Sequence, residues 1–421
     1  MLINEEVIAK YLEKYFNKIF EEKIIIEVEG NFYVLNKKLK IPIYKFWKYT
    51  DKELFRDFNV YSFKDDYIGT IFFFLSGYWE YTHNEMKDKY FRFPAKESFQ
   101  YKKGILEEPI VEILVERIRY EISLELKENK PKYFITHDID MLSLANGFSF
   151  YKNVVGDIIK RKSPSLALRK LAMKVKRENP FSVSNLVNMH EKNGTKGTFF
   201  FMPDIQPKLT PGGYDLDNNK DYLRRLVKEI KSIGGSIGMH YDGRHLTENR
   251  MHDDIKSLEN IFQTKIDCGR AHFLLFSIKK SFDIYEKSGI KLDTSGGFAD
   301  KVGFRFGTCK PFRPFSFEEG KEYNIIEMPL IVMDGSLKSE KYMNLSPEEG
   351  FRKIRALISK VHKYTGVFTI LWHNTSFFTG GWENWEWVYH RVLKNAVKND
   401  FEFVTSKDVI REFVEKDERI S

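Results

Sequence analysis

The chain has 421 residues, with 68 Lys and Arg against 60 Asp and Glu, so its formal net charge is +8. Hydrophobic residues make up 42% of the chain and charged residues 30%, which excludes wholesale disorder. At about 150 residues per domain, this length predicts two or three domains. The positive excess is too small to indicate a nucleic-acid partner, and we expect none.

Targeting signals and disulfides are not evident in the sequence. The longest apolar run, residues 68–78, is much shorter than the ~20 residues that a membrane-spanning helix needs. The first twenty residues lack the uninterrupted apolar region of a secretory signal. Cys268 and Cys309 are the only cysteines, so neither a disulfide framework nor a CxxC metal knuckle is expected. These features favour a cytoplasmic protein.

The first 128 residues read as a separate, smaller α+β domain of unknown role. Helical spacing of apolar residues over 5–20 is followed by short alternating segments at 23–28 and 32–35. An aromatic-rich stretch covers 65–103, and a second helical pattern covers 109–127. The charged, proline-containing run at 127–132 marks the boundary to a second domain over 129–421.

From residue 133 onwards, strand-like runs alternate with helical patterns. The expected strands include 133–140, 196–202, 236–240, 271–276, 325–329 and 367–373, with helical patterns between most of them. Such alternation favours βαβ units and a mostly parallel sheet or barrel. The segment over about 141–180 is too long for a simple loop, and we expect an insertion there.

Two acids follow the first strand of this second domain. In Thr136-His-Asp-Ile-Asp140, alternation places Thr136, Asp138 and Asp140 on one face and His137 on the other. Two carboxylates at the C-terminal end of a parallel strand repel each other, so a cation such as a metal ion should lie nearby. The alternative is an ordinary strand end with solvated acids, and the motif alone favours that alternative.

Two histidines and an arginine follow later strands. His240 ends a strand and His245 follows a glycine-containing turn, so both imidazoles can converge on one ion. Arg270, in Arg270-Ala-His272, can pair with a carboxylate and keep it ionised. One carboxylate with two histidines leaves positions for water, as in catalytic metal sites. The alternatives are a loop with unrelated histidines, a surface arginine and a half-buried His272.

The last strand delivers His373 at its tip, in Phe368-Thr-Ile-Leu-Trp-His-Asn374. Histidine can transfer a proton near neutral pH. A single histidine at a strand end is more often simply hydrogen-bonded. The proton-transfer role of His373 is favoured because four separate strand ends each present titratable or cationic groups.

The expected insertion is basic and amphipathic over residues 152–177. This segment contains nine Lys and Arg residues and a single acid, Asp157, and aliphatic residues are interleaved among them. Such a segment suits an anionic membrane surface or a phosphate ligand. A solvated helix packed on the barrel explains the pattern equally well.

In this order the four patterns resemble the polysaccharide deacetylase family, the NodB-homology carbohydrate esterases, over roughly residues 130–410. The N-terminal unit resembles an uncharacterised domain that precedes some deacetylase-like proteins of surface-glycan gene clusters. The resemblance implies a distorted (β/α)7-type barrel and one divalent ion, zinc above all, held by Asp140, His240 and His245. The family separates its two histidines by four residues and this chain by five. Whether His245 or His272 completes the metal site therefore stays open.

The resemblance also implies catalytic and substrate-binding roles. Asp138 would be the base, steadied by Arg270, and His373 would protonate the departing amine. Asp293, in the motif Asp293-Thr-Ser-Gly-Gly-Phe-Ala-Asp300, would orient His373. Leu371 and Trp372 would line the substrate pocket.

The implied activity is metal-dependent hydrolysis of an N-acyl group, N-acetyl in the first instance, from an amino sugar of a surface polysaccharide or its biosynthetic intermediate. One alternative is an amidase or imidase acting on a non-sugar C–N bond in the same fold. A second is a catalytically inactive barrel that binds glycans. For a cytoplasmic enzyme, the basic segment would be a peripheral contact with the inner face of the membrane.

Overall fold

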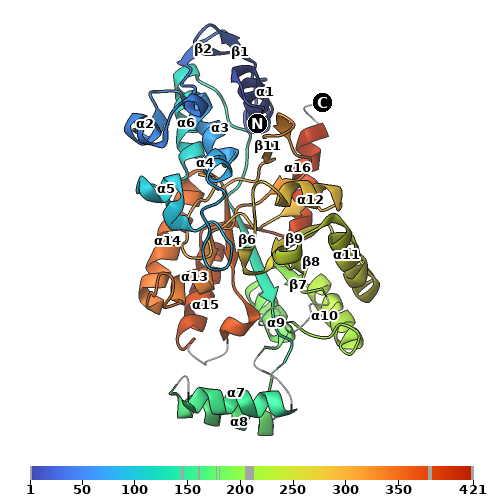
Figure 1. Ribbon diagram of the computed structural model, residues 1–421. Helices are drawn as coiled ribbons and strands as arrows, with labels where there is room; N and C mark the ends of the chain where they lie inside the picture. Colours follow the sequence, from blue (N-terminus) through green and yellow to red (C-terminus); the bar gives the residue numbers. More distant parts are fainter. Residues whose placement is uncertain are drawn as a thin grey trace.

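The computed structural model describes residues 2–143, 147–159, 162–176, 178–179, 181–203, 213–377 and 382–418 (Figure 1). Within these ranges, no helix has both the length and the apolar character that crossing a membrane requires.

A parallel sheet of nine strands forms the centre of the second domain. The strands are β6 (Lys132–Ile139), β7 (Thr198–Phe201), β8 (Ser236–Tyr241), β9 (Cys268–Ala271), β10 (Leu292–Asp293), β13 (Ile326–Glu327), β14 (Val332–Met333), β15 (Val367–Leu371) and β16 (Glu402–Val404). All nine are short, and every described residue of β6 to β9 is buried. Strands buried on both faces are the rule in parallel sheets, because helices cover them on either side.

The strand order is that of a barrel with one open seam. It runs β13-β10-β9-β8-β7-β6-β15-β14, with β16 beside β6. The two ends of this order, β13 and β14, follow each other directly in the chain. The barrel-type α/β fold predicted from the sequence is therefore confirmed, and the C-terminal ends of its strands gather at one end of the sheet.

Helices follow most of the strands and cover the sheet. They are α9 (Val183–Asn193), α10 (Lys220–Ser232), α11 (Glu248–Phe262), α12 (Ser281–Lys287), α13 (Asp334–Lys338), α14 (Pro347–Lys363), α15 (Trp385–Lys398) and α16 (Ser406–Glu418). The local sequence explains why α14 begins where it does, because Ser346 and Glu349 form a capping box around the N-terminal proline. The buried residues of α10 recur at three- and four-residue spacing, which directs one face of the helix to the sheet.

The smaller N-terminal domain lies at the other end of the sheet and along one side of it (Figure 1). Its helices are α1 (Glu5–Asn17), α2 (Asp51–Asp57), α3 (Tyr67–Leu75), α4 (Tyr78–Thr82), α5 (Phe99–Lys102) and α6 (Ile110–Ile122). Its strands are β1 (Ile26–Glu29), β2 (Phe32–Leu35), β3 (Leu39–Pro42), β4 (Phe58–Asn59) and β5 (Ser62–Phe63). Glu80 accepts two hydrogen bonds from the guanidinium of Arg305, and both side chains are buried. This ion pair joins the two parts of the chain.

The expected insertion forms a helical hairpin of α7 (Gly147–Ile159) and α8 (Pro164–Lys176). Phe150, Val154 and Ala167 form a small core between the two helices. Figure 1 draws the hairpin apart from the barrel, beyond the arrowhead of β6.

One predicted strand, the run over 271–276, lies earlier in the chain than expected. The run over 271–276 is not extended, because β9 ends at Ala271 and the 3-10 turn η4 (His272–Leu274) follows. Phe273 has φ 59° and Leu274 φ 53°, a conformation that non-glycine residues seldom adopt. This bend decides where the His272 side chain lies.

Candidate metal and acid–base site

The candidate site lies at the C-terminal ends of four strands. Asp138 lies in β6, with Asp140 directly after it, and His240 lies in β8. Arg270 lies in β9, where it pairs in register with His240. Because parallel strands end at the same edge of a sheet, residues from distant parts of the chain meet there.

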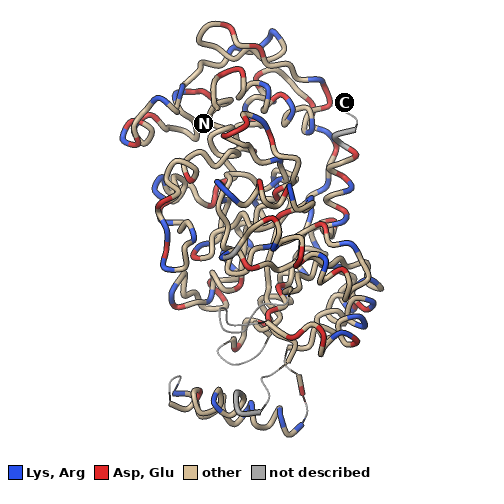
Figure 2. The backbone as a smooth tube through the Cα atoms, turned by 45° about the vertical axis from the view of Figure 1, so that its right-hand side comes forward, with Lys and Arg blue, Asp and Glu red and all other residues tan. Residues whose placement is uncertain are grey.

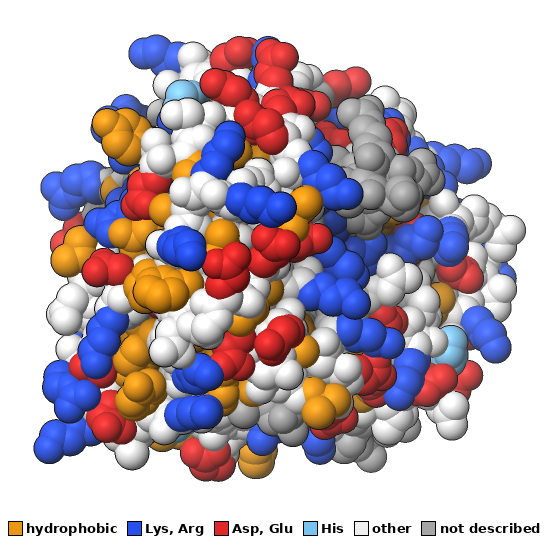
Figure 3. Space-filling view, turned by 90° about the horizontal axis from the view of Figure 1, so that it is seen from above, with side chains coloured by type: hydrophobic (Ala, Val, Ile, Leu, Met, Phe, Trp, Pro, Cys, Tyr) orange, Lys and Arg blue, Asp and Glu red, His pale blue; other side chains and the backbone are white. Residues whose placement is uncertain are grey.

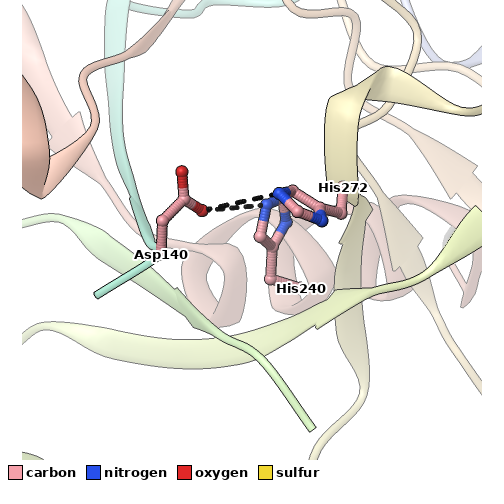
Figure 4. A group of neighbouring side chains, drawn as sticks. All are labelled: Asp140, His240 and His272. Carbon is pink, nitrogen blue, oxygen red and sulfur yellow. Dashed lines mark ion pairs between the residues drawn. The ribbon is translucent and has the colours of Figure 1, made fainter. Parts of the chain in front are cut away.

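Asp140, His240 and His272 form a cluster of metal-ligand type (Figure 4). One ligand atom from each of the three lies within 4.8 Å of the others. Asp140 Oδ1 is 3.5 Å from His240 Nε2 and 4.0 Å from His272 Nε2. Both rings point towards the carboxylate in Figure 4. This arrangement allows all three side chains to bind one ion.

The hydrogen bonding of this cluster fits a metal ion. Asp140 Oδ1 and His240 Nε2 are buried, and neither has a hydrogen-bond partner among the described residues. His240 Nδ1 is 3.1 Å from the backbone oxygen of Arg270, which identifies Nδ1 as the protonated nitrogen and leaves the Nε2 lone pair free. Buried polar atoms without partners are rare in proteins, and here two of them belong to side chains whose ligand atoms lie close together, which fits a shared ion.

His272 is suited to be a neutral ligand. Burial, followed by the neighbouring His240, lowers the pKa of His272 to about 2. The imidazole is therefore uncharged at neutral pH and keeps a lone pair for coordination. A carboxylate with two imidazoles is a donor set typical of zinc, with coordination positions left over for water and substrate.

Asp138 lies beside this cluster and is held by Arg270. Arg270 Nη1 donates to Asp138 Oδ1 at 3.0 Å and to Thr136 Oγ1 at 2.7 Å. The other oxygen, Asp138 Oδ2, is 3.5 Å from His240 Nε2. Burial favours a raised pKa, but the neighbouring His240, Arg270 and His373 outweigh it and hold the pKa of Asp138 below its ordinary value. Asp138 is therefore ionised at neutral pH.

His373 is held by Asp334, a residue that the sequence did not single out. Its Nδ1 is 2.7 Å from Asp334 Oδ1, and its backbone N–H donates to Asp334 Oδ2 at 2.8 Å. Burial acts to lower the pKa of His373, but the charge and hydrogen bond of Asp334 outweigh it and raise the pKa to about 10. His373 and Asp140 are each 20% exposed, more than Asp138 or His240, so they lie nearest the solvent.

Asp293 differs from our expectation, because it does not contact His373. It accepts hydrogen bonds from Tyr241 Oη at 2.5 Å and from the hydroxyl and backbone N–H of Ser295, each at 2.9 Å. It also shares a hydrogen bond with Glu327 of β13. Asp293 ends β10, and four strands lie between β10 and β15 in the sheet, so this position directs Asp293 into a separate buried network.

The two expected substrate contacts have different environments. Trp372 is fully buried and packs against Phe377, Trp385 and Tyr389, so its indole is part of the core. The strand ends at Leu371, and the next side chain turns into the helix layer. Leu371 is also buried, in a small apolar cluster with Leu274, Ala299 and Leu330.

The two further histidines of the sequence analysis are His245 and His137. The backbone of His245 ends the 3-10 turn η3 (Gly243–His245), but its side chain lies outside the described residues. His137 points away from the site, as strand alternation predicts, and its Nε2 is 2.9 Å from His190 Nε2. Burial lowers the pKa of His137 to about 4, so it is an uncharged part of the core.

The N-terminal domain contacts the turn that carries His272. Arg92 Nη1 donates to the backbone oxygen of Phe273 at 3.1 Å, while Arg92 is itself held by Asp88 at 2.7 Å. The ring of Tyr90 lies parallel to that of Phe273, with 6.2 Å between the centroids. Residues 88–92 thus support a strained turn next to the metal-ligand cluster.

Comparisons with known proteins give limited matches. Residues 4–126 match a family model described as a family of unknown function, DUF7033. No curated protein sequence is significantly similar to the chain. The chain is similar to the solved structure of a protein from Mycobacterium smegmatis described as a polysaccharide deacetylase, with 14% identity, a TM-score of 0.45 and coverage of 69% of this chain and 92% of that chain.

Two further solved structures are similar at the same level. The PuuE allantoinase is 11% identical, with a TM-score of 0.43 and coverage of 67% of this chain and 89% of that chain. A Pseudomonas aeruginosa PAO1 protein described as a probable polysaccharide deacetylase is 12% identical, with the same TM-score of 0.43 and the same coverage of 67% and 89%. Similarities of this size do not carry an activity from one protein to another.

Proposed function

We propose that the chain is a metal-dependent hydrolase that removes an N-acyl group, N-acetyl in the simplest case, from an amino sugar of a surface polysaccharide or its biosynthetic intermediate. The observation that carries this proposal is the set of unpartnered donor atoms on Asp140 and His240, next to an ionised carboxylate and a protonated imidazole. The choice of an amino sugar rests on the ordered motifs that resemble the deacetylase family.

In this proposal Asp140, His240 and His272 would hold the ion, and their donor set favours zinc. A bound ion of this kind supplies Lewis acidity, which acidifies water and polarises an amide carbonyl. Asp140 is 20% exposed and the two histidines are buried, so the ligand set is open on the side of the carboxylate.

Asp138 would accept the proton of the attacking water. A general base must be unprotonated at the working pH, and the lowered pKa of Asp138 meets this requirement. The hydrogen bonds from Arg270 Nη1 to Asp138 and Thr136 fix the direction of the carboxylate. Arg270 also donates from Nε to the backbone oxygen of Thr294 at 3.2 Å, so its guanidinium is held through both Nε and Nη1.

His373 would give a proton to the departing amine, which is a poor leaving group as an anion. The acid must be protonated before the reaction, and the raised pKa of His373 keeps it so at neutral pH. Asp334 binds Nδ1, which directs Nε2 of the same ring away from Asp334 and makes it the nitrogen free to act on substrate. Two groups with pKa values moved in opposite directions form a complementary acid–base pair.

The apolar cluster around Leu371 would accommodate the acyl methyl group. Leu371 precedes His373 by two residues, and Leu274 follows His272 by two residues. The cluster is therefore connected to both sides of the candidate site. An apolar wall of this kind favours a short acyl chain over a charged group.

The direct test is a hydrolysis assay on the full chain loaded with Zn²⁺. We expect release of acetate from N-acetylated amino sugars, free or in oligosaccharides, and none from His240→Ala, which lacks a ligand. Arg250→Lys, on the outer helix α11, is a matched control and should retain activity. Each variant is checked for folding by circular dichroism.

Three outcomes would contradict the proposal. Hydrolysis of cyclic imides or simple amides without activity on acetylated sugars would support an amidase instead. Glycan binding with no hydrolysis would support an inactive binding barrel. Undiminished hydrolysis by His240→Ala would show that the reaction does not use this site.

A further inference from the structure

The α7–α8 hairpin has an apolar surface that its own packing does not use. On α7, Tyr151, Val155, Ile158 and Ile159 are all exposed, and their spacing of four, three and one residues places them on one face. On α8, exposed apolar residues recur at three- and four-residue spacing, at Leu168, Leu171 and Val175. Each helix therefore has a second apolar stripe, separate from the small core of Phe150, Val154 and Ala167.

This exposure is concentrated in the hairpin. The described chain has seventeen exposed large hydrophobic residues, and seven of them lie on α7 and α8. Each of these helices has only thirteen residues. Val175 is 83% exposed and Ile159 69%, which is unusual for aliphatic side chains in a folded domain. A concentration of exposed apolar side chains of this kind indicates an interaction site.

The hairpin also carries the net charge of the whole chain. Residues 147–177 contain nine Lys and Arg and one acid, so this segment accounts for the full net charge of +8. The single acid, Asp157, is buried, and its Oδ2 is 2.7 Å from Lys170 Nζ. Blue and tan segments alternate along the hairpin in Figure 2, whereas basic and acidic side chains are interspersed on the face shown in Figure 3.

We propose that the α7–α8 hairpin docks the protein on the surface of an anionic lipid bilayer. Helices that combine aliphatic stripes with many Lys and Arg lie in the interface, where the apolar side chains enter the acyl boundary and the cations reach anionic headgroups. A second copy of the chain is a poor occupant, because two hairpins of the same high positive charge repel each other. A soluble polyanion would leave the aliphatic side chains in water.

The position of the hairpin relates this surface to the candidate site. α7 begins seven residues after Asp140, and the hairpin lies beyond the strand ends that carry the site (Figure 1). Docking would therefore bring the open end of the barrel towards the bilayer. The proposal itself does not depend on the proposed hydrolase activity.

The test is flotation of the full chain with vesicles of phosphatidylcholine, with and without about a third phosphatidylglycerol. We expect binding to the anionic vesicles only, weakened at least about tenfold when the salt concentration rises from about 0.1 M to 0.5 M. A fluorophore on Asn153→Cys, an exposed position on α7, should shift to shorter emission wavelength on binding. The two native cysteines are buried, so labelling is specific to this site.

Two sets of substitutions separate the charge from the apolar stripes. Lys152→Glu with Arg169→Glu removes exposed cations, and Val155→Ser, Ile159→Ser, Leu168→Ser and Val175→Ser together remove exposed apolar side chains while leaving the inner core intact. We expect each set to weaken vesicle binding about tenfold or more. Matched controls with exposed residues elsewhere, Lys38→Glu with Lys52→Glu and Val60→Ser with Tyr120→Ser, should bind like the unmodified chain.

The proposal would be overturned by any of three results. These are no binding to anionic vesicles at low salt, unchanged binding by both hairpin variants, or full binding by the apolar variant with loss only in the charge variant. The last result would identify the hairpin as a site for a soluble polyanion or an acidic protein. Thermal unfolding of each variant confirms that the barrel remains folded.

Discussion

Two carboxylate pairs lie among the strand ends of the barrel, and their surroundings differ. Asp138 and Asp140 face His240, Arg270 and His272, and several donor atoms among them have no partner in the described chain. Asp293 and Glu327 face Tyr241, Ser295 and the backbone of Gly296. Cations hold the pKa of Asp138 down, whereas burial, followed by the charge of Asp293, raises the pKa of Glu327 well above its ordinary value.

Asp138 and Asp140 belong to a site that can bind a ligand, whereas Asp293 and Glu327 belong to a hydrogen-bond network that stabilises the fold. Glu327 Oε2 has no hydrogen-bond partner while both carboxyls of its pair are ionised, but one proton shared between Asp293 and Glu327 satisfies it without any further molecule. Asp138 instead stays ionised, and Asp140 Oδ1 and His240 Nε2 beside it have no partner in the described chain. Acidic residues at a strand end are therefore insufficient to locate a site, and the pairing of their neighbours decides which kind they form.

The largest effect is expected for Asp138→Asn, which keeps the shape of the side chain and an acceptor for Arg270 but cannot take a proton. Turnover should fall by about 10²- to 10⁴-fold while the bound metal content stays unchanged. The measurement is kcat together with elemental analysis of the same sample. Asp283→Asn, an exposed acid of α12, is the control. Near-normal turnover in Asp138→Asn would refute its role as the base.

An intermediate effect is expected for Asp334→Asn. Asp334 keeps His373 protonated, so without its charge the effect of burial prevails and the pKa of His373 falls from about 10. Activity requires the protonated form, so it should decline from a lower pH than in the unmodified enzyme, and kcat at neutral pH should drop about ten- to a hundredfold. A pH–rate profile measures both. An unchanged alkaline limb would show that His373 is not the acid.

The smallest effect on activity is expected for Glu327→Gln. The protonated Glu327 donates to Asp293 and accepts from Gly296 N at 2.9 Å, and a glutamine can make both hydrogen bonds. We expect kcat within about twofold of the unmodified value.

Stability adds a second measurement for this variant. Because the folded-state pKa of Glu327 is raised above its unfolded value, its contribution is fully present below the unfolded pKa and is lost as the pH rises through the folded pKa. The free energy of unfolding should therefore decline less in Glu327→Gln as the pH rises above the unfolded pKa of a glutamate. A large loss of turnover in this variant would place the second carboxylate pair in the reaction.

Much of the site follows from the sequence because strand alternation is a strict rule. The run from Thr136 to Asp140 predicts that Asp138 and Asp140 share a face and that His137 does not, and the structure has this arrangement. His240 ends the predicted strand 236–240, whereas Arg270 precedes the predicted strand 271–276 and lies within β9 in the structure. Parallel pairing then brings these ends together.

The residues that sequence reasoning missed depend on features without a local signal. Asp334 follows a strand of only two residues, too short to show alternation. His272, which the sequence left open as the third ligand, reaches the cluster because Phe273 and Leu274 adopt positive φ, and neither position has the glycine that would mark such a turn in the sequence. That turn is held by Arg92 of the N-terminal domain, 181 residues away in the sequence. Trp372 was expected in the substrate pocket, but it lies in the same core cluster as Phe368 and Ile370, on the face that strand alternation directs into the helix layer.

The central claim is that Asp140, His240 and His272 bind one divalent ion, and the metal content of two histidine variants tests it most directly. The full chain is loaded with Zn²⁺, passed through a desalting column and analysed for zinc per chain, as are His272→Ala and His245→Ala. We predict about one zinc per chain for the unmodified protein and for His245→Ala, and a strong loss in His272→Ala. Full zinc retention in His272→Ala, with loss in His245→Ala, would contradict this ligand set.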